Sequence, residues 1–178
     1  MWFRCSIFTL VLYVFFFNAN VFGARSVSVD KLRIKKQLNG WIEENGSYQV
    51  INTKNLFEII NGGAPAYIDN GMKKGIYQRL MTTDSTMAIE LFAEDFGSAE
   101  MAEKMFNDKS TANVSESAED QNPEGRIINK IVGGFWCCQV IEQYYFELTL
   151  TGVTDKEKVV AELDKVMGFY QKVIKGGN

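Results

Sequence analysis

The sequence has no histidine among its 178 residues, and it has only three cysteines and two prolines. Without histidine there is no Ser-His-Asp or Cys-His nucleophile pair, no imidazole acid or base, and no histidine ligand for zinc or haem. The remaining residues form no catalytic motif strong enough to name a reaction, and they predict no cofactor. A binding protein is therefore favoured over an enzyme.

Positive charge is also scarce. The sequence has 19 Lys and Arg against 22 Asp and Glu, which gives a formal net charge of −3. The only basic concentration comprises Lys31, Arg33, Lys35 and Lys36, whereas a nucleic-acid-binding surface needs a larger cluster of phosphate contacts. We therefore interpret these charges as a solvated face and expect no nucleic-acid partner.

The first 23 residues have the pattern of a secretory signal peptide. The apolar run at residues 7–17 is 11 residues long, and signal peptides use about 7 to 15 such residues where a membrane-spanning helix needs about 17 to 25. Val21 and Gly23 are the small residues that a signal peptidase requires, so we predict cleavage after Gly23 and export to the periplasm or the extracellular space. An uncleaved anchor over Phe3–Phe22 is the alternative, and it would be the only contact with a membrane.

The mature chain is predicted to contain a lead-in at residues 24–39 and one domain at residues 40–178. Apolar residues spaced three and four apart predict a helix that begins after Thr53, is kinked by Gly62, Gly63 and Pro65, and ends at Asn70-Gly71. Alternating residues predict a hairpin over 75–92 that turns at 83–85, and two or three further strands over 126–150. A short helix follows Ser98, and a capping box at Thr154 and Glu157 begins a long amphipathic helix that ends at Gly176.

Hairpins separated by helices are typical of an α+β fold. We expect an antiparallel sheet of about five strands, packed against the long C-terminal helix and the kinked N-terminal helix. Residues 107–125 are rich in Ser, Thr, Asn, Glu and Asp, and Val114 is their one large apolar residue. They predict a mobile acidic loop, whose acids lack the spacing of a calcium-binding loop.

Residues Leu56–Tyr67, which read LFEIINGGAPAY, form a motif preceded by Gly40-Trp41. They resemble the L-F-E-x-I-N-G-x-A-x-x-Y signature of an uncharacterised family of exported bacterial proteins, and Ile89–Phe92 and Ser98–Ala102 are similar to the segments that come next in that family. The resemblance covers residues 40–178 and implies an extracytoplasmic bacterial domain, but no reaction. The chain departs from the family at Pro65, where an acidic residue is usual, and it has no lipobox cysteine at the predicted cleavage site.

This motif supplies one candidate ligand site. Asn61, Gly62 and Gly63 can form a nest of backbone N–H groups for an anion, although close helix packing or a turn explains the same glycines. Tyr67 and Asp69 can line a small polar pocket together with Asn61. The predicted occupant is a small ligand or another extracytoplasmic protein.

Aromatic residues are concentrated in a second candidate region, which contains Phe135, Trp136, Tyr144, Tyr145 and Phe146. Strand alternation places Tyr145 on the face opposite Tyr144 and Phe146. Five aromatic residues exceed what one face of a sheet needs for a core, so Trp136 and Tyr145 are candidate ligand contacts, and packing in the core is the alternative use.

Cys137 and Cys138 are adjacent in a predicted strand, so their side chains point to opposite faces. Their Cα atoms are about 3.8 Å apart, which disfavours a strain-free disulfide. We expect one thiol in the core and one half-exposed, with an intermolecular disulfide as the alternative. Two adjacent thiols without histidine do not predict a metal site.

Carboxylates are the remaining candidates for acid or base catalysis. Two carboxyl groups held about 5 to 9 Å apart can cleave a glycosidic bond. The alternative to a binding domain is therefore a carboxylate-based extracytoplasmic hydrolase that uses Glu58, Glu90 or Glu94, and Glu142 with Glu147 is a further concentration of acids. A structural subunit of an extracellular assembly is the third hypothesis.

Overall fold

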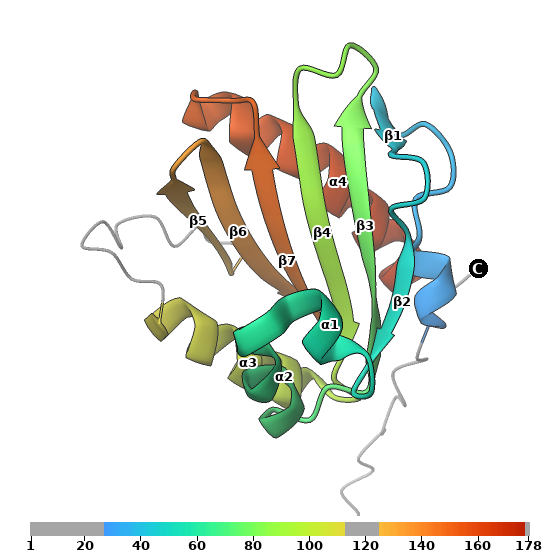
Figure 1. Cartoon of the computed structure of the whole chain (residues 1–178), viewed down its shortest axis with the longest axis vertical. Helices are drawn as coiled ribbons and strands as arrows, with labels where there is room; N and C mark the ends of the chain where they lie inside the picture. The colour runs from blue at the N-terminus through green and yellow to red at the C-terminus, as the bar shows by residue number, and fades with distance from the viewer. Residues whose placement is uncertain (1–26, 113–124, 177–178) are drawn as a thin grey trace, which may run out of the picture.

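One antiparallel sheet runs through the molecule and has helices on both faces (Figure 1). The computed structural model describes residues 27–112 and 125–176, so the predicted signal peptide lies outside the described residues. Its elements, in chain order, are η1 (Val29–Leu32), β1 (Trp41–Glu43), β2 (Gln49–Asn52), α1 (Leu56–Ile60), η2 (Asn61–Gly63), α2 (Ala64–Asp69), β3 (Lys74–Thr82), β4 (Ala88–Asp95), α3 (Ala99–Ala112), β5 (Arg126–Ile131), β6 (Gly134–Ile141), β7 (Tyr144–Thr151) and α4 (Lys156–Gly176).

The sheet has seven strands in the order β1-β3-β4-β7-β6-β5, with β2 also paired to β3. The α+β class, the antiparallel sheet and the long C-terminal helix are confirmed. The prediction of about five strands is lower than the observed seven because it did not include β1 and β2, which have only three and four residues. Strands of that length are too short for alternation to be visible in the sequence.

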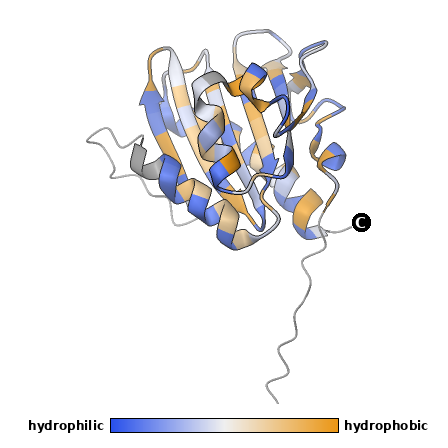
Figure 2. Cartoon of the chain, turned by 60° about the horizontal axis from the view of Figure 1, so that its bottom comes forward, coloured by the Kyte–Doolittle hydropathy of each residue, from blue (hydrophilic) through white to orange (hydrophobic). Residues whose placement is uncertain are grey.

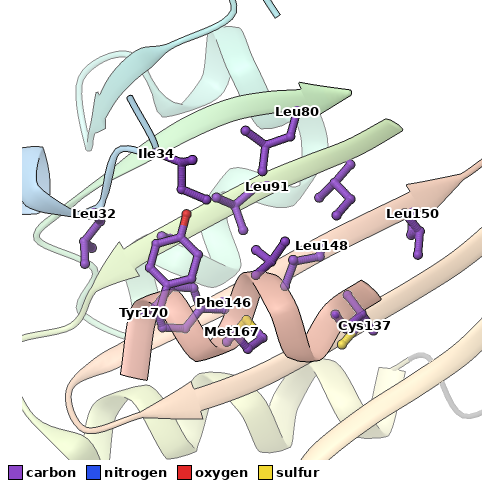
Figure 3. Close-up of a cluster of buried hydrophobic side chains, with 14 of the residues drawn as sticks. Leu32, Ile34, Leu80, Leu91, Cys137, Phe146, Leu148, Leu150, Met167 and Tyr170 are labelled. Carbon is purple, nitrogen blue, oxygen red and sulfur yellow. The ribbon is translucent and has the colours of Figure 1, made fainter. Parts of the chain in front are cut away.

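Two hydrophobic layers sandwich the sheet. Helix α4 and η1 cover one face, where the apolar stripe of α4 packs against inward residues of β3, β4, β6 and β7. Figure 3 shows Met167 and Tyr170 of α4 beside Phe146 and Leu148 of β7. Val29 and Leu32 of the predicted lead-in are buried in the same layer. Hydrophobic residues lie along the strands of the sheet, and the helices that cover it carry both hydrophobic and hydrophilic residues (Figure 2).

Helices α1, α2 and α3 lie over the other face, at the end of the sheet where β4 ends and β7 begins (Figure 1). The kink predicted between Leu56 and Tyr67 is confirmed: α1 and α2 are separated by the 3₁₀ turn η2, and Pro65 lies in the first turn of α2. Helix α2 ends at Asp69 with Asn70 as its C-cap, and Gly71 has a φ of +84°. Thr53 is not the N-cap, because α1 begins only at Leu56.

The predicted N-terminal boundary of the acidic loop, residue 107, is wrong because helix α3 extends past it. Helix α3 starts after Ser98, whose Oγ accepts a hydrogen bond from the Met101 amide at 3.3 Å, and it continues to Ala112. Residues 107–112 are therefore helical. Lys109 in this stretch contacts Glu147 of β7 and the ring of Tyr67 in α2. Tertiary contacts of this kind are invisible to composition. Residues 113–124 lie outside the described part of the chain.

Helix α4 begins one residue later than the capping box implies. Asp155 Oδ1 accepts a hydrogen bond from the Lys158 amide at 2.7 Å, so Asp155 rather than Thr154 is the capping side chain. The predicted end at Gly176 is confirmed. Across residues 27–112 and 125–176, no helix is long and apolar enough to cross a membrane.

Candidate functional site

Four side chains from four elements converge on the carboxylate of Glu147 in β7. The Tyr67 hydroxyl of α2 donates to Oε2 at 2.6 Å, and the Tyr145 hydroxyl of β7 donates to the same oxygen at 3.2 Å. The Trp136 indole N–H of β6 donates to Oε1 at 2.9 Å. The Lys109 ammonium of α3 lies 3.4 Å from Oε2. All four groups are donors, so the two carboxyl oxygens of Glu147 serve as acceptors in every one of these contacts.

The strand register explains why the sheet residues meet. Glu147 lies opposite Cys138 of β6 and Phe92 of β4, and Tyr145 lies opposite Glu94. Side chains two apart on one strand point to the same face, so Tyr145 and Glu147 both face the α2 and α3 side. Glu94 is a diagonal neighbour of Glu147 on the adjacent strand, a separation that long side chains bridge.

Glu94 is the unusual member of this group. Its side chain is fully buried, and neither carboxyl oxygen has a hydrogen-bond partner among the described residues. Burial raises the pKa of Glu94 well above its usual range, the Glu147 carboxylate raises it further, and the Lys109 ammonium acts in the opposite direction. An unpaired carboxyl in this environment binds its proton more tightly than an exposed carboxyl does.

We refer to Glu94, Glu147, Tyr67, Tyr145, Trp136 and Lys109 as the carboxylate cluster. Burial raises the pKa values of the Tyr67 and Tyr145 phenols, and the neighbouring carboxylates add to this shift, so both phenols remain hydrogen-bond donors. The cluster is graded in exposure: the side chains of Glu147 and Lys109 are 18% and 19% exposed, whereas Glu94 is fully enclosed. Solvent therefore reaches the cluster from the Glu147 side.

The cluster unites three of the seven candidate ligand residues predicted from the sequence, namely Tyr67, Trp136 and Tyr145. Gly62 and Gly63 lie in η2 between α1 and α2, and neither has a positive φ. Their helical backbone fits the packing explanation better than the anion nest. Asp69 is exposed near the end of α2, and the side chain of Asn61 lies outside the described structure.

The aromatic side chains predicted as a ligand surface are covered. Tyr145 is fully buried and Trp136 is 8% exposed, and both belong to the hydrophobic layer beneath α2 and α3. Phe96 packs edge-on against Tyr145 at 6.3 Å between ring centroids. The faces assigned by alternation are correct, since Tyr144 and Phe146 belong to the opposite layer.

The prediction that one strand thiol is half-exposed is wrong. Cys137 and Cys138 are both buried and free, on opposite faces of the sheet. Helices cover both faces at this point, so the alternation that separates the two thiols exposes neither. Burial raises the pKa of Cys137 to about 12.

The acids proposed for catalysis do not form one site. Glu58 and Glu90 are exposed, whereas Glu94 lies in the carboxylate cluster with Glu147. No group of three His, Cys, Asp or Glu side chains in the described ranges is arranged to hold a metal ion. The sequence could have indicated that Glu147 lies near Tyr145, because strand alternation places both side chains on the same face of the sheet. No local pattern indicated that Lys109 joins it.

Comparisons with known proteins add little to this geometry. No family model matches the chain, and no curated protein matches it. Among solved structures, the chain is similar to the extracellular domain of PknH from Mycobacterium tuberculosis, with a TM-score of 0.44 and 10% identity. That likeness covers 79% of this chain and 83% of the PknH domain.

Proposed function

We propose that the protein is an exported, non-catalytic binding domain whose ligand site is the carboxylate cluster. The observation that carries the proposal is Glu94, a fully buried carboxyl for which the described part of the chain offers neither oxygen a hydrogen-bond partner. Leaving such a group unpaired costs about 1 to 3 kcal/mol, so native proteins pair most of them. A bound ligand would supply the missing partner.

The surroundings of Glu94 favour a small ligand over a protein partner. Glu147 and Lys109 are less than one-fifth exposed, and the rings of Tyr67 and Tyr145 lie 6.4 Å apart between centroids. A folded partner cannot reach the buried carboxyl, whereas a few heavy atoms can be enclosed after a small movement of the helices. Export itself rests on the apolar segment at residues 7–17 and the small residues before the predicted cleavage site.

A carboxylate-based hydrolase is the second candidate function. It is favoured by the contrast between Glu94, whose pKa is raised by burial, and the hydrogen-bonded Glu147, because acid and base carboxyls in glycosidases are held in contrasting environments. The burial of Glu94 argues against it, since a polymer must lie between the two carboxyls to be cleaved. We therefore prefer binding without catalysis.

The experiment compares ligand-induced stabilisation of three proteins. A small-molecule library is screened by thermal unfolding against the wild type, Glu94→Gln, and the control Glu90→Gln, whose parent residue is exposed on the same strand. Compounds that bind the cluster raise the Tm of the wild type and of Glu90→Gln, and they raise that of Glu94→Gln less. If every stabilising compound acts equally on all three proteins, the cluster is not the site.

A further inference from the structure

The carboxylate cluster already contains one bound ammonium group. Lys109 Nζ lies 3.4 Å from Glu147 Oε2 and 4.7 Å from the centroid of the Tyr67 ring. A carboxylate together with an aromatic face is a common arrangement for holding a cation. The Glu147 half of the cluster is thus built as an ammonium site, and the chain fills it with its own lysine.

Glu94, by contrast, has no hydrogen-bonded cation within residues 27–112 and 125–176. The charged groups that act on Glu94 are Glu147 from β7 and Lys109 from α3. The phenols of Tyr67 and Tyr145, which also face it, are neutral donors held by Glu147. With both carboxyls ionised, the cluster would hold two negative charges against one positive charge. One further cation would balance it.

Resting on the proposed function, we propose that the ligand is a small organic cation with a primary ammonium head, which binds Glu94 as the second ammonium of the carboxylate cluster. Both unpaired oxygens of Glu94 need hydrogen-bond donors. A primary ammonium supplies three N–H donors together with the missing charge. A quaternary ammonium has the charge without the donors, and an alcohol has a donor without the charge.

Binding includes one proton transfer. The Glu94 carboxyl gives its proton to the buffer, the ammonium keeps its three protons, and an ammonium–carboxylate pair replaces the neutral acid. No other bond changes. The apolar remainder of the ligand would lie against Phe96 and Tyr145, which belong to the same hydrophobic layer.

Isothermal titration calorimetry of the full chain tests this with three probes of similar size: n-propylammonium, n-propanol and tetramethylammonium. Near pH 7, in two buffers of different ionisation enthalpy, we expect n-propylammonium to bind with release of about one proton. The other two probes are expected to bind at least about tenfold more weakly, because each lacks one of the two required features. The affinity for n-propylammonium should rise up to about tenfold per pH unit while Glu94 is protonated in the free protein.

Glu94→Gln provides the matched variant and Glu90→Gln its control. The first should lose at least about tenfold in n-propylammonium affinity together with proton release, and the second should lose neither. If n-propanol binds as tightly as n-propylammonium, or if no proton is released, the inference is wrong while a ligand site at the cluster stands. If n-propylammonium does not bind, the inference is likewise overturned. If the library screen also yields no compound that depends on Glu94, the proposed function fails with it.

Discussion

Replacing Glu94 by glutamine should stabilise the protein at neutral pH. The amide keeps the shape of the protonated carboxyl and its two buried polar atoms, so packing and the unpaired groups are nearly unchanged. The substitution removes only the ability of the side chain to ionise. In the wild type, the folded state retains this proton well above the pKa of 4.5 that the unfolded chain has.

The sign and the size of the effect are set by linkage. Since the folded pKa is raised, the folded state binds more protons than the unfolded state above pH 4.5, and stability falls as the pH rises toward the folded pKa. Each pH unit in that range costs about 1.4 kcal/mol for one proton. Glu94→Gln should therefore match the wild type below about pH 4.5 and exceed it by up to about 3 kcal/mol at pH 7.

Urea unfolding of wild type and Glu94→Gln between about pH 5 and 8 measures this difference. Histidine does not contribute to the pH dependence of stability in this range, because the chain contains none. Glu90→Gln, on the exposed part of β4, should follow the wild-type curve within about 0.5 kcal/mol. Parallel curves for wild type and Glu94→Gln, or a less stable glutamine variant at pH 7, would refute the buried protonated acid.

Three further outcomes are expected from the same contacts. Tyr67→Phe removes the 2.6 Å hydrogen bond to Glu147 and should lower the free energy of unfolding by about 1.5 to 3 kcal/mol in urea titrations; a loss below about 0.5 kcal/mol would mean that the bond is weak. In a Cys5→Ser background, Cys137 and its neighbour should show no fast thiol labelling in the native protein and two reactive thiols in denaturant; one fast native thiol would contradict their burial. Gly134→Ala would place a Cβ against the Leu150 carbonyl oxygen, so its Tm should fall as the unfolding free energy drops by about 1 to 3 kcal/mol. The control Gly62→Ala meets no atom within 4 Å, and its Tm should change far less. Equal Tm values for the two variants would show that β6 relaxes freely.

Local patterns in the sequence determined most of the elements. The hairpin over 75–92, the two or three strands predicted over 126–150 and the long C-terminal helix each follow from residue patterns that span a few positions. The kink at Gly62, Gly63 and Pro65 is equally local, because proline lacks the N–H that a continuous helix needs. Alternation also assigned Tyr145 and Tyr144 to opposite faces of the sheet.

Which of those faces are covered, and by what, was decided only by the tertiary structure. The Tyr67 hydroxyl reaches a carboxylate 80 residues away, and Lys109 reaches it from a helix extending into a stretch that composition assigned to a loop. The thiols at 137 and 138 are both buried because helices pack on both sides of one strand. Burial and the pKa of Glu94 depend on neighbours from distant elements. A period of two or 3.6 residues orients a side chain along its own strand or helix and contains no information on which other element will lie against it.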